Sequence, residues 1–376
     1  MPAWEVAGTP VTFRSEDELR PAPEAVGSAF LFPAAAASCD LVLPEPVDPR
    51  WHAGVLEAAA LARRWWGWRV PALRGPVGAP DRPGDGVALC FTGGIDSFHS
   101  LLCNPERPTR LVFAVGYDVP LDDHARREAL LPHLQAVAEG VSLPLTVVET
   151  DLRRHPLFAR ASWERTHGGA LAALGHLLGA GTVQLSASAT PGTDWPWGSH
   201  PRLDPCWSST RTTVRHVGFG PSRFGKVAAV ASSPLVRDHL QVCWERRTAT
   251  GNCGRCLKCV ITMTCLDAVG ALEGSTAFPE GSRAELADRI DALPIGRFPL
   301  STREALARTT RPDVAAALAG LLDRMPSRGP TAGEWGRRRA ARARLRHAAA
   351  RRTPAPAKRW LRQVGQPRKT GSRFSK

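Results

Sequence analysis

From Gly86 onward, short apolar runs alternate with longer segments of helical pattern, and this alternation restricts the chain to few folds. The apolar runs predict strands at residues 87–91, 111–115, 145–148 and 182–187. The longer segments predict helices, among them 123–139 and 167–178, although Pro132 argues against one continuous helix in the first. This rhythm indicates an α/β fold, in which a parallel sheet carries helices on both faces and binds its ligand at the carboxyl ends of the strands.

The flanking regions have different patterns. The N-terminal region combines strand-like runs at 28–32 and 39–43 with a helical stretch at 52–66, and the Pro- and Gly-rich segment 74–86 is interpreted as a linker. Polar, helix-prone segments follow the α/β region at 282–293 and 302–325. The expected organisation is an N-terminal α+β unit at 1–80, an α/β domain at 84–275, a helical extension at 276–327 and a basic, disordered tail at 328–376.

The positive charge of the chain is confined to its C-terminal end. The formal net charge is +14, yet residues 328–376 hold sixteen basic residues and one acid, Glu334, which leaves 33 basic and 34 acidic residues in the first 327. A uniform basic groove through the folded part is therefore excluded. Any contact with RNA is expected to come from the tail.

Neither a membrane segment nor a disulfide framework is expected. The apolar run 29–43 is interrupted by Pro33 and Asp40 and is too short to cross a bilayer, and the first residues lack the basic and apolar pattern of a secretion signal. The nine cysteines are an odd number, and four of them fall within residues 243–259. These features favour metal binding in a reducing compartment, and hence a cytoplasmic protein.

A glycine turn directly follows the first strand of the alternating region. The run Thr92-Gly93-Gly94-Ile95-Asp96-Ser97 leads from the apolar segment 87–91 into a helix that is expected to begin near Asp96. Glycines allow successive backbone N–H groups to face an anion, and the positive end of the helix adds to this attraction. Thr92 and Ser97 offer hydroxyls to the same phosphate, while Asp96 would hold Mg²⁺ or cap the helix.

Four cysteines have the spacing of a closed metal site. Cys243 is followed by Cys253, Cys256 and Cys259, so a Cys-x-x-Cys-x-x-Cys knuckle is completed by one upstream cysteine. Four thiolates suit a tetrahedral Zn²⁺ with a structural role. An iron–sulfur cluster or redox chemistry remains the alternative for thiolates this close.

The glycine turn resembles the Ser-Gly-Gly-x-Asp-Ser loop of the PP-loop ATP pyrophosphatases, which have a HUP-type, Rossmann-like nucleotide-binding fold. Thr92 replaces the usual first Ser and keeps its hydroxyl. Together with the cysteine spacing, the turn is similar to that of 7-cyano-7-deazaguanine synthase-like proteins over residues 86–270. The resemblance implies that Thr92, Gly93, Gly94, Asp96 and Ser97 bind ATP, with Asp96 and Ser97 acting in catalysis, and that ATP is split to AMP and pyrophosphate after a substrate oxygen is adenylated.

The segment 185–204 occupies the place where those synthases read their substrate, but it does not reproduce their usual pattern there. Asp194, Trp197, His200 and Asp204 are the candidate substrate-binding residues, because two tryptophans, a histidine and acids suit a pocket with stacking walls and polar anchors. Its Pro and Gly residues also fit a structural crossover. The departure argues against a deazaguanine substrate.

The run Gly220-Pro-Ser-Arg-Phe-Gly-Lys226-Val227 copies the spacing of a Walker A loop, but Val227 stands where a magnesium-binding Ser or Thr is needed. A β–γ-cleaving ATPase is therefore not expected. Lys226 is one of two lysines before the tail, and it is a candidate to offset charge in the adenylation step. A surface lysine at a helix start is the alternative.

The leading hypothesis is an ATP-, Mg²⁺- and Zn²⁺-dependent ligase that adenylates a carboxylate or carbonyl oxygen of a small molecule for attack by nitrogen. The alternatives are a tRNA-thiolating enzyme that holds RNA with its tail and carries sulfur on Cys206 or Cys265, and an epimerase of a cell-wall precursor. A zinc-stabilised nucleic-acid-binding protein is a third, non-enzymatic possibility. Single histidines such as His99 and His176 are interpreted as packing or surface positions.

Overall fold

Seven strands form the central sheet of the computed structural model, which describes residues 1–325 apart from 193–194, 244, 246–247, 249–250 and 294–298. Their order is β1-β2-β7-β6-β5-β8-β9. The five strands from β7 to β9 in this order are parallel, whereas β2 pairs antiparallel with β7, and β1 pairs antiparallel with β2. The strands are β1 (Ala3–Val6), β2 (Thr9–Arg14), β5 (Asp85–Cys90), β6 (Arg110–Val115), β7 (Leu145–Thr150), β8 (Ala180–Ser186) and β9 (Thr213–Val217).

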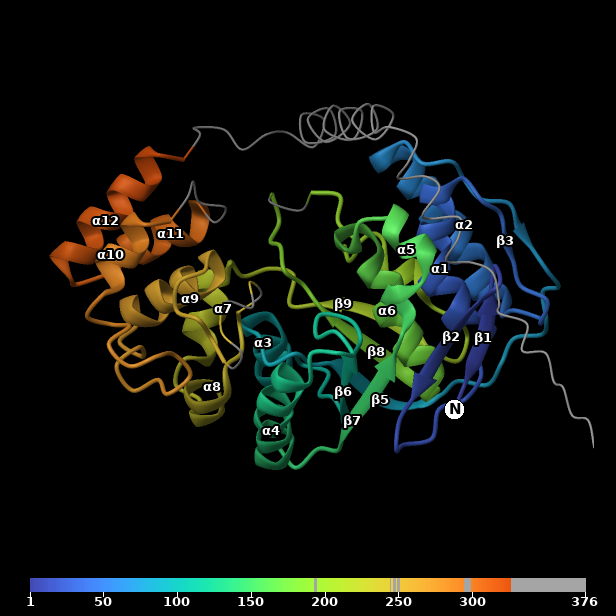
Figure 1. The fold of residues 1–376 in the computed structure, drawn as a ribbon, viewed down its shortest axis with the longest axis horizontal. Helices are drawn as coiled ribbons and strands as arrows, with labels where there is room; N and C mark the ends of the chain where they lie inside the picture. Colours follow the sequence, from blue (N-terminus) through green and yellow to red (C-terminus); the bar gives the residue numbers. More distant parts are fainter. Residues whose placement is uncertain (193–194, 244, 246–247, 249–250, 294–298, 326–376) are drawn as a thin grey trace, which may run out of the picture. The chain divides into compact units, whose positions relative to one another are not determined.

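Helices cover both faces of this sheet, as predicted for the α/β class, and Figure 1 shows the sheet between α1 and α6 on one side and α3 and α4 on the other. The α-helices of the described residues are α1 (Pro23–Ala37), α2 (Pro49–Trp66), α3 (Ile95–Cys103), α4 (His124–Gly140), α5 (Pro156–Arg160), α6 (Trp163–Leu178), α7 (Arg223–Val230), α8 (Pro234–His239), α9 (Leu257–Ala268), α10 (Leu286–Asp291), α11 (Pro299–Leu306) and α12 (Pro312–Asp323). Two short 3₁₀ helices, η1 (Leu152–Arg154) and η2 (Asp204–Trp207), lie in connecting segments.

The central strands β5 and β6 are largely apolar on both faces because each face is buried under helices. In β5, Ala88 and Cys90 contribute to the core beneath α1 and α6, whereas Leu89 and the following Phe91 contribute to the core beneath α3 and α4. This alternation has the two-residue period of a strand. The continuous apolar run at 87–91 therefore predicts a central strand correctly.

The order of the parallel strands creates a reversal point between β5 and β8. From β5 the chain adds β6 and then β7 on one side of the sheet. The connection through α5 and α6 then returns the chain to the other side of β5, where β8 pairs with it. In open sheets of this kind, the crevice at the carboxyl ends of the two strands that flank the reversal is the usual ligand site. The turn after β5 lies at this point.

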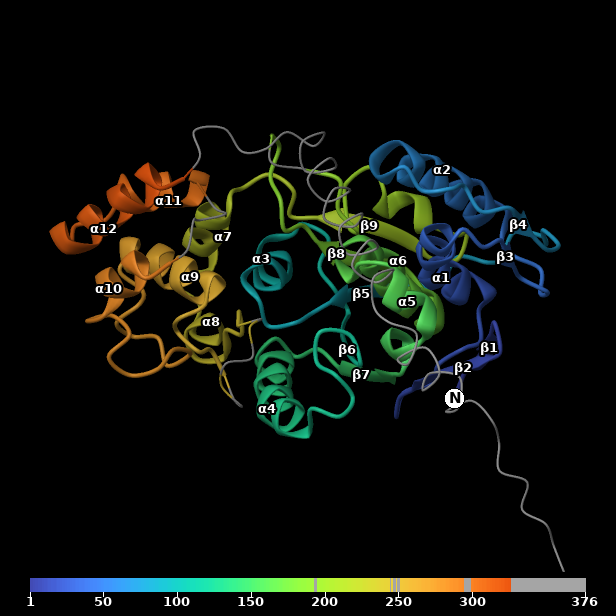
Figure 2. The ribbon, with the colours of Figure 1, turned by 45° about the horizontal axis from the view of Figure 1, so that its top comes forward.

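The N-terminal residues contribute to the same sheet and core. β1 and β2 extend the sheet beyond β7, and α1 packs closely on α6. The predicted basic tail at 328–376 lies outside the described residues. In Figure 2, α7 to α12 gather beyond α3, where α7 contacts both α3 and α9.

Several predicted elements need correction. Residues 28–32, expected as a strand, lie inside α1, which is buried on nearly every side; a short apolar run does not distinguish a buried helix from a strand. The run at 39–43 contains only β3 (Leu41–Val42), which pairs with β4 (Leu73–Arg74). α4 continues through Pro132 as a single helix. β1, β2 and β9 were not expected.

Candidate functional site

The glycine turn connects β5 to α3 at the reversal point of the sheet. Gly93 adopts a φ of 71°, a left-handed conformation that favours glycine, and Gly94 is the N-cap residue of α3. A Cβ atom on Gly93 would lie 3.1 Å from Leu134 and 3.3 Å from the side chain of Gln241. The backbone N–H of Gln241 donates a 2.7 Å hydrogen bond to the carbonyl of Gly93. The backbone conformation favours glycine here, and a Cβ atom would need Leu134 or Gln241 to move by a few tenths of an ångström.

The two hydroxyl residues of the turn have different environments. Ser97 is buried and donates a hydrogen bond of 2.9 Å to the carbonyl of Gly94, which closes the first turn of α3. Thr92 is exposed at the start of the turn. The nine-residue helix α3 therefore directs its N-terminal end toward a surface that carries one exposed hydroxyl.

Lys226 forms an ion pair with Asp96 at this turn. Its Nζ atom lies 3.0 Å from Asp96 Oδ1, and it also donates a hydrogen bond to the carbonyl of Ala187, the residue after β8. Arg223 Nη1 lies 3.6 Å from Asp96 Oδ2. Burial by itself would raise the pKa of Asp96, but the charges of Lys226 and Arg223 outweigh it and hold the pKa below its ordinary value. One carboxylate and two cations therefore converge where β5 and β8 end.

The placement of Lys226 excludes both the Walker A geometry and the surface alternative. α7 begins at Arg223 with Ser222 as its N-cap, whose Oγ accepts a 3.0 Å hydrogen bond from the Gly225 N–H. Lys226 is thus the fourth residue of the helix, not the end of a phosphate loop. Its side chain points into the protein and the residue is only 1% exposed.

Further polar atoms gather at the same strand ends. Burial lowers the pKa of His99 on α3, and the charge of Lys226 adds to this effect. His99 Nδ1, Ser186 Oγ and His216 Nε2 are buried and have no hydrogen-bond partner among the described residues. Buried polar atoms are rarely left without partners in folded proteins, so such a group indicates a place where a ligand or water binds.

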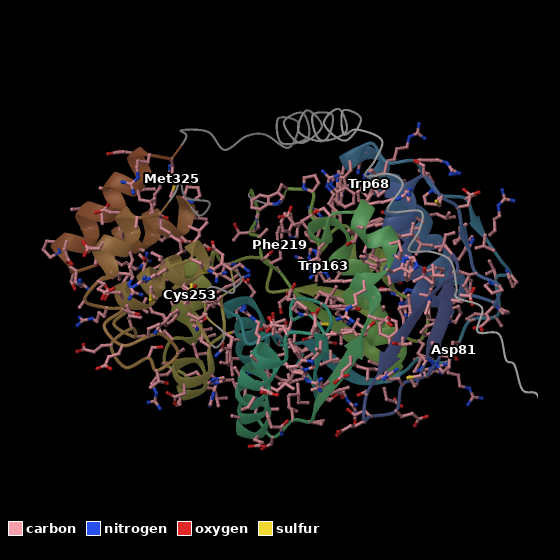
Figure 3. The ribbon with its side chains drawn as sticks, in the orientation of Figure 1. Trp68, Asp81, Trp163, Phe219, Cys253 and Met325 are labelled. Carbon is pink, nitrogen blue, oxygen red and sulfur yellow. The ribbon has the colours of Figure 1, made fainter. Side chains whose placement is uncertain are left out.

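The four cysteines converge on one point at the N-terminal end of α9. Their sulfur atoms all lie within 4.8 Å of one another, and the Cys253–Cys259 and Cys243–Cys256 pairs are each 4.0 Å apart. Tetrahedral Zn²⁺ with Zn–S bonds of about 2.3 Å needs sulfur atoms about 3.8 Å apart. The four thiols therefore fit a zinc ion, and Figure 3 shows Cys253 among α7, α8 and α9.

Hydrogen bonds among the cysteine thiols and the backbone position the residues of this site. The N–H of Cys256, the N-cap of α9, lies 3.3 Å from Cys253 Sγ. Hydrogen bonds from Cys256 and Cys259 lower the pKa of Cys243, whereas the hydrogen bond with Cys243 raises the pKa of Cys256 to about 11. These opposite shifts of the pKa reflect how closely the four sulfur atoms approach one another.

Asn252 connects the cysteine site to the glycine turn. Its Oδ1 accepts hydrogen bonds from the N–H groups of Val242 and Cys243, at 2.7 and 3.0 Å, and its Nδ2 donates to the carbonyls of Leu240 and Ala277. The segment held in this way includes Gln241, whose N–H binds the carbonyl of Gly93. A zinc ion here would hold the chain that packs against the turn.

The candidate substrate residues are not gathered in one exposed pocket. Asp204 is fully buried, and its carboxylate accepts hydrogen bonds from Ser199 Oγ at 2.6 Å and from His216 Nδ1 at 2.7 Å. His200 is buried against the ring of Trp65, and Trp197 lies beside His167. Asp194 lies outside the described residues. Of the three described candidates only Trp197 is partly exposed, and the assignment of these residues to a substrate pocket stays a prediction.

Sequence reasoning missed Arg223, Ser199 and His216, which all contact predicted residues.

Two cavities, of about 400 and 580 Å³, lie away from these residues. One is at the amino ends of β5, β6 and β8, and the other is beside Phe278 and Arg311. Among the described residues, no helix is both long and apolar enough to span a membrane.

A scan against protein-family models finds no match, and a search of curated proteins finds no similar sequence.

Proposed function

We propose that this protein is an ATP-dependent enzyme of the PP-loop pyrophosphatase type. It adenylates a carboxylate oxygen of a small molecule, releases pyrophosphate, and then lets a nitrogen nucleophile displace AMP. The supporting observation is the Asp96–Lys226 pair, which lies beside a glycine turn at the reversal point of the parallel sheet. The parallel order β7-β6-β5-β8-β9 and the turn after β5 also suit a HUP-type fold.

In this proposal the turn binds the phosphates of ATP. The backbone N–H groups from Gly93 to Ser97 and the N-terminal end of α3 attract the anionic phosphates, and the exposed Thr92 hydroxyl adds a donor. Lys226 is preorganised in a buried position, where a positive charge stabilises developing negative charge more strongly than it does in water.

Asp96 has the chemistry of a magnesium ligand. Its Oδ1 atom is bound to Lys226, but Oδ2 lies 3.6 Å from Arg223, beyond hydrogen-bonding distance, and the side chain is 23% exposed. Carboxylate oxygen is the ligand that Mg²⁺ prefers. A Mg²⁺ ion held there would neutralise phosphate charge, while Lys226 and Arg223 keep Asp96 in position.

A pyrophosphate-release assay with ATP, Mg²⁺ and a panel of carboxylic acids tests this function. At least one acid should stimulate release, and Asp96→Ala should reduce that release at least 100-fold, whereas Asp122→Ala, at an exposed aspartate on the loop before α4, should leave it unchanged. Release that persists in the Asp96 variant would exclude the assignment.

The RNA-thiolating alternative receives less support. The two cysteines suggested as sulfur carriers, Cys206 and Cys265, are buried, and burial raises the pKa of each thiol to about 12. Sulfur transfer needs a reactive thiolate, which this environment disfavours. Deletion of residues 328–376 should spare pyrophosphate release by an enzyme that acts on a small molecule and cripple one that acts on RNA.

A further inference from the structure

A buried aspartate and histidine form a dyad at the carboxyl ends of the strands. Asp204 Oδ2 accepts hydrogen bonds from His216 Nδ1 at 2.7 Å and from Ser199 Oγ at 2.6 Å, while Asp204 Oδ1 accepts from the His200 N–H at 3.2 Å. A carboxylate oxygen only accepts hydrogen bonds, so Nδ1 of His216 carries its hydrogen. In the neutral imidazole the opposite ring nitrogen, Nε2, is then an acceptor with a free lone pair.

The strand that carries His216 is connected to the glycine turn through the end of β8. His216 on β9 pairs with Leu185 of β8, and the following residue, Val217, accepts a backbone hydrogen bond from Ala187, whose own carbonyl binds Lys226. Burial raises the pKa of the Cys90 thiol to about 12, and the charge of Asp204 adds to this, which indicates that Asp204 lies near the end of β5. The dyad thus spans the reversal point from β9 toward β5.

The free nitrogen distinguishes this histidine from a purely structural one. His155, which is also buried, uses both ring nitrogens: Nε2 contacts the carbonyl of Val6, and Nδ1 accepts from the Leu157 N–H. The His216 side chain is 5% exposed, yet its Nε2 has no hydrogen-bond partner among the described residues. A buried acceptor of this kind is costly unless a ligand or water binds it.

We propose that His216 is the general base of the nitrogen-transfer step, with Asp204 as its positioning residue. This inference rests on the proposed function. When an amine attacks the adenylated carboxyl carbon, a C–N bond forms, the C–O bond to AMP breaks, and the nitrogen must lose one proton. Nε2 of His216 accepts that proton and later releases it to solvent, while Asp204 holds the ring in the Nδ1–H tautomer.

The tautomer can be measured without knowing the substrate. In the full-length protein with ¹⁵N-labelled histidine, nuclear magnetic resonance should show neutral His216 with a hydrogen on Nδ1 and none on Nε2. His216→Asn assigns the signal by its disappearance, and Asp204→Asn should convert part of the population to the Nε2–H form. A wild-type His216 with its hydrogen on Nε2 would overturn the proposal.

The second experiment compares two nitrogen nucleophiles on the carboxylic acid that drives pyrophosphate release. Ammonia is mostly ammonium near neutral pH and must lose protons, whereas hydroxylamine is mostly unprotonated and needs a base less. His216→Asn should lower amide formation from ammonium chloride at least 100-fold and lower hydroxamate formation far less, while the first-turnover burst of pyrophosphate, which precedes AMP displacement, is still formed. His124→Asn, at the exposed first residue of α4, is the matched control.

The outcomes separate the two proposals. Amide formation by His216→Asn at the wild-type rate would refute the role of His216 and leave the adenylation function intact. If no acid stimulates pyrophosphate release by the wild-type protein, the proposed function fails, and the role of His216 in it fails as well. If His216→Asn does not fold, Asp204→Asn provides the same comparison, because it changes the tautomer and keeps the imidazole.

Discussion

Lys226 Nζ lies 3.0 Å from Oδ1 of Asp96, although 130 positions separate the two residues along the chain. The contact joins α7 to the first turn of α3 and brings a buried cation to the glycine turn. It gives the site both its charge balance and part of its stability, and these two contributions can be tested separately.

Removal of Lys226 should destabilise the fold. Lys226→Ala removes the nearest cation of Asp96 and leaves the more distant Arg223 and Lys258, and breaking a buried ion pair in this way costs about 3 kcal/mol in the free energy of unfolding. Urea denaturation measures this loss. The double variant Lys226→Met with Asp96→Asn removes both charges and should be closer to the wild type; equal stability of wild type and Lys226→Ala would contradict the pairing.

The cysteine site should bind one zinc ion per chain. Cys256→Ser should lose that zinc and lower the melting temperature, because the site holds the start of α9 and the segment around Asn252. Elemental analysis and thermal unfolding measure the two effects. Cys39→Ser changes an exposed cysteine outside the cluster and should keep the metal; a metal-free wild type would show that the four thiols serve another purpose.

Substitution of Gly93 separates crowding from backbone strain. Gly93→Ala places a Cβ atom 3.1 Å from Leu134 in a left-handed conformation, and should cost about 2–3 kcal/mol, of which strain supplies about 1 kcal/mol. Gly270→Ala has a similar φ of 74° but nothing within 4 Å of its Cβ, so it should cost only the strain. Denaturation of both variants tests the difference, and equal losses would argue against tight packing at the turn.

His176 should make stability depend on pH. Burial lowers its pKa from an ordinary 6.5 to about 4, and its Nε2 binds the carbonyl of Trp207 at 2.9 Å. Between about pH 6.5 and pH 4, His176 is therefore protonated in the unfolded chain but not in the folded chain. The free energy of unfolding should fall by about 3 kcal/mol as the pH is lowered across this range. It should fall no further below pH 4.

His176→Gln keeps an N–H donor for Trp207 without the titration. The difference in unfolding free energy between wild type and this variant, followed by urea denaturation from pH 7.5 to pH 4, isolates the contribution of His176. A difference that does not change with pH would show that the imidazole titrates normally in the fold.

The parts of the site that sequence analysis predicted are those formed by local chain segments. The turn between β5 and α3 follows from six consecutive residues, and the cysteine cluster follows from the spacing of Cys253, Cys256 and Cys259. In both cases a short-range rule of backbone geometry or metal chemistry decides the structure.

The remaining parts depend on contacts between distant segments. β9 has the sequence Thr-Val-Arg-His-Val, and its polar residues interrupt the apolar pattern by which a strand is recognised. Because this strand was not predicted, His216 could not be placed beside Asp204. The apolar stretch in α1 fits a strand as well as a helix until its packing against α6 is known. Burial of Asp204 likewise follows from tertiary packing, which sequence pattern alone does not reveal.

The hydrogen bond from Gln241 to Gly93 bears on how the protein is made. A ribosome synthesises the glycine turn well before it reaches Lys226, Gln241 and the cysteines. Until those residues emerge, the nascent chain has an Asp96 without its cation and a Gly93 carbonyl without its donor. The turn is therefore completed late in translation, and a chain that terminates before residue 226 lacks both groups that hold it.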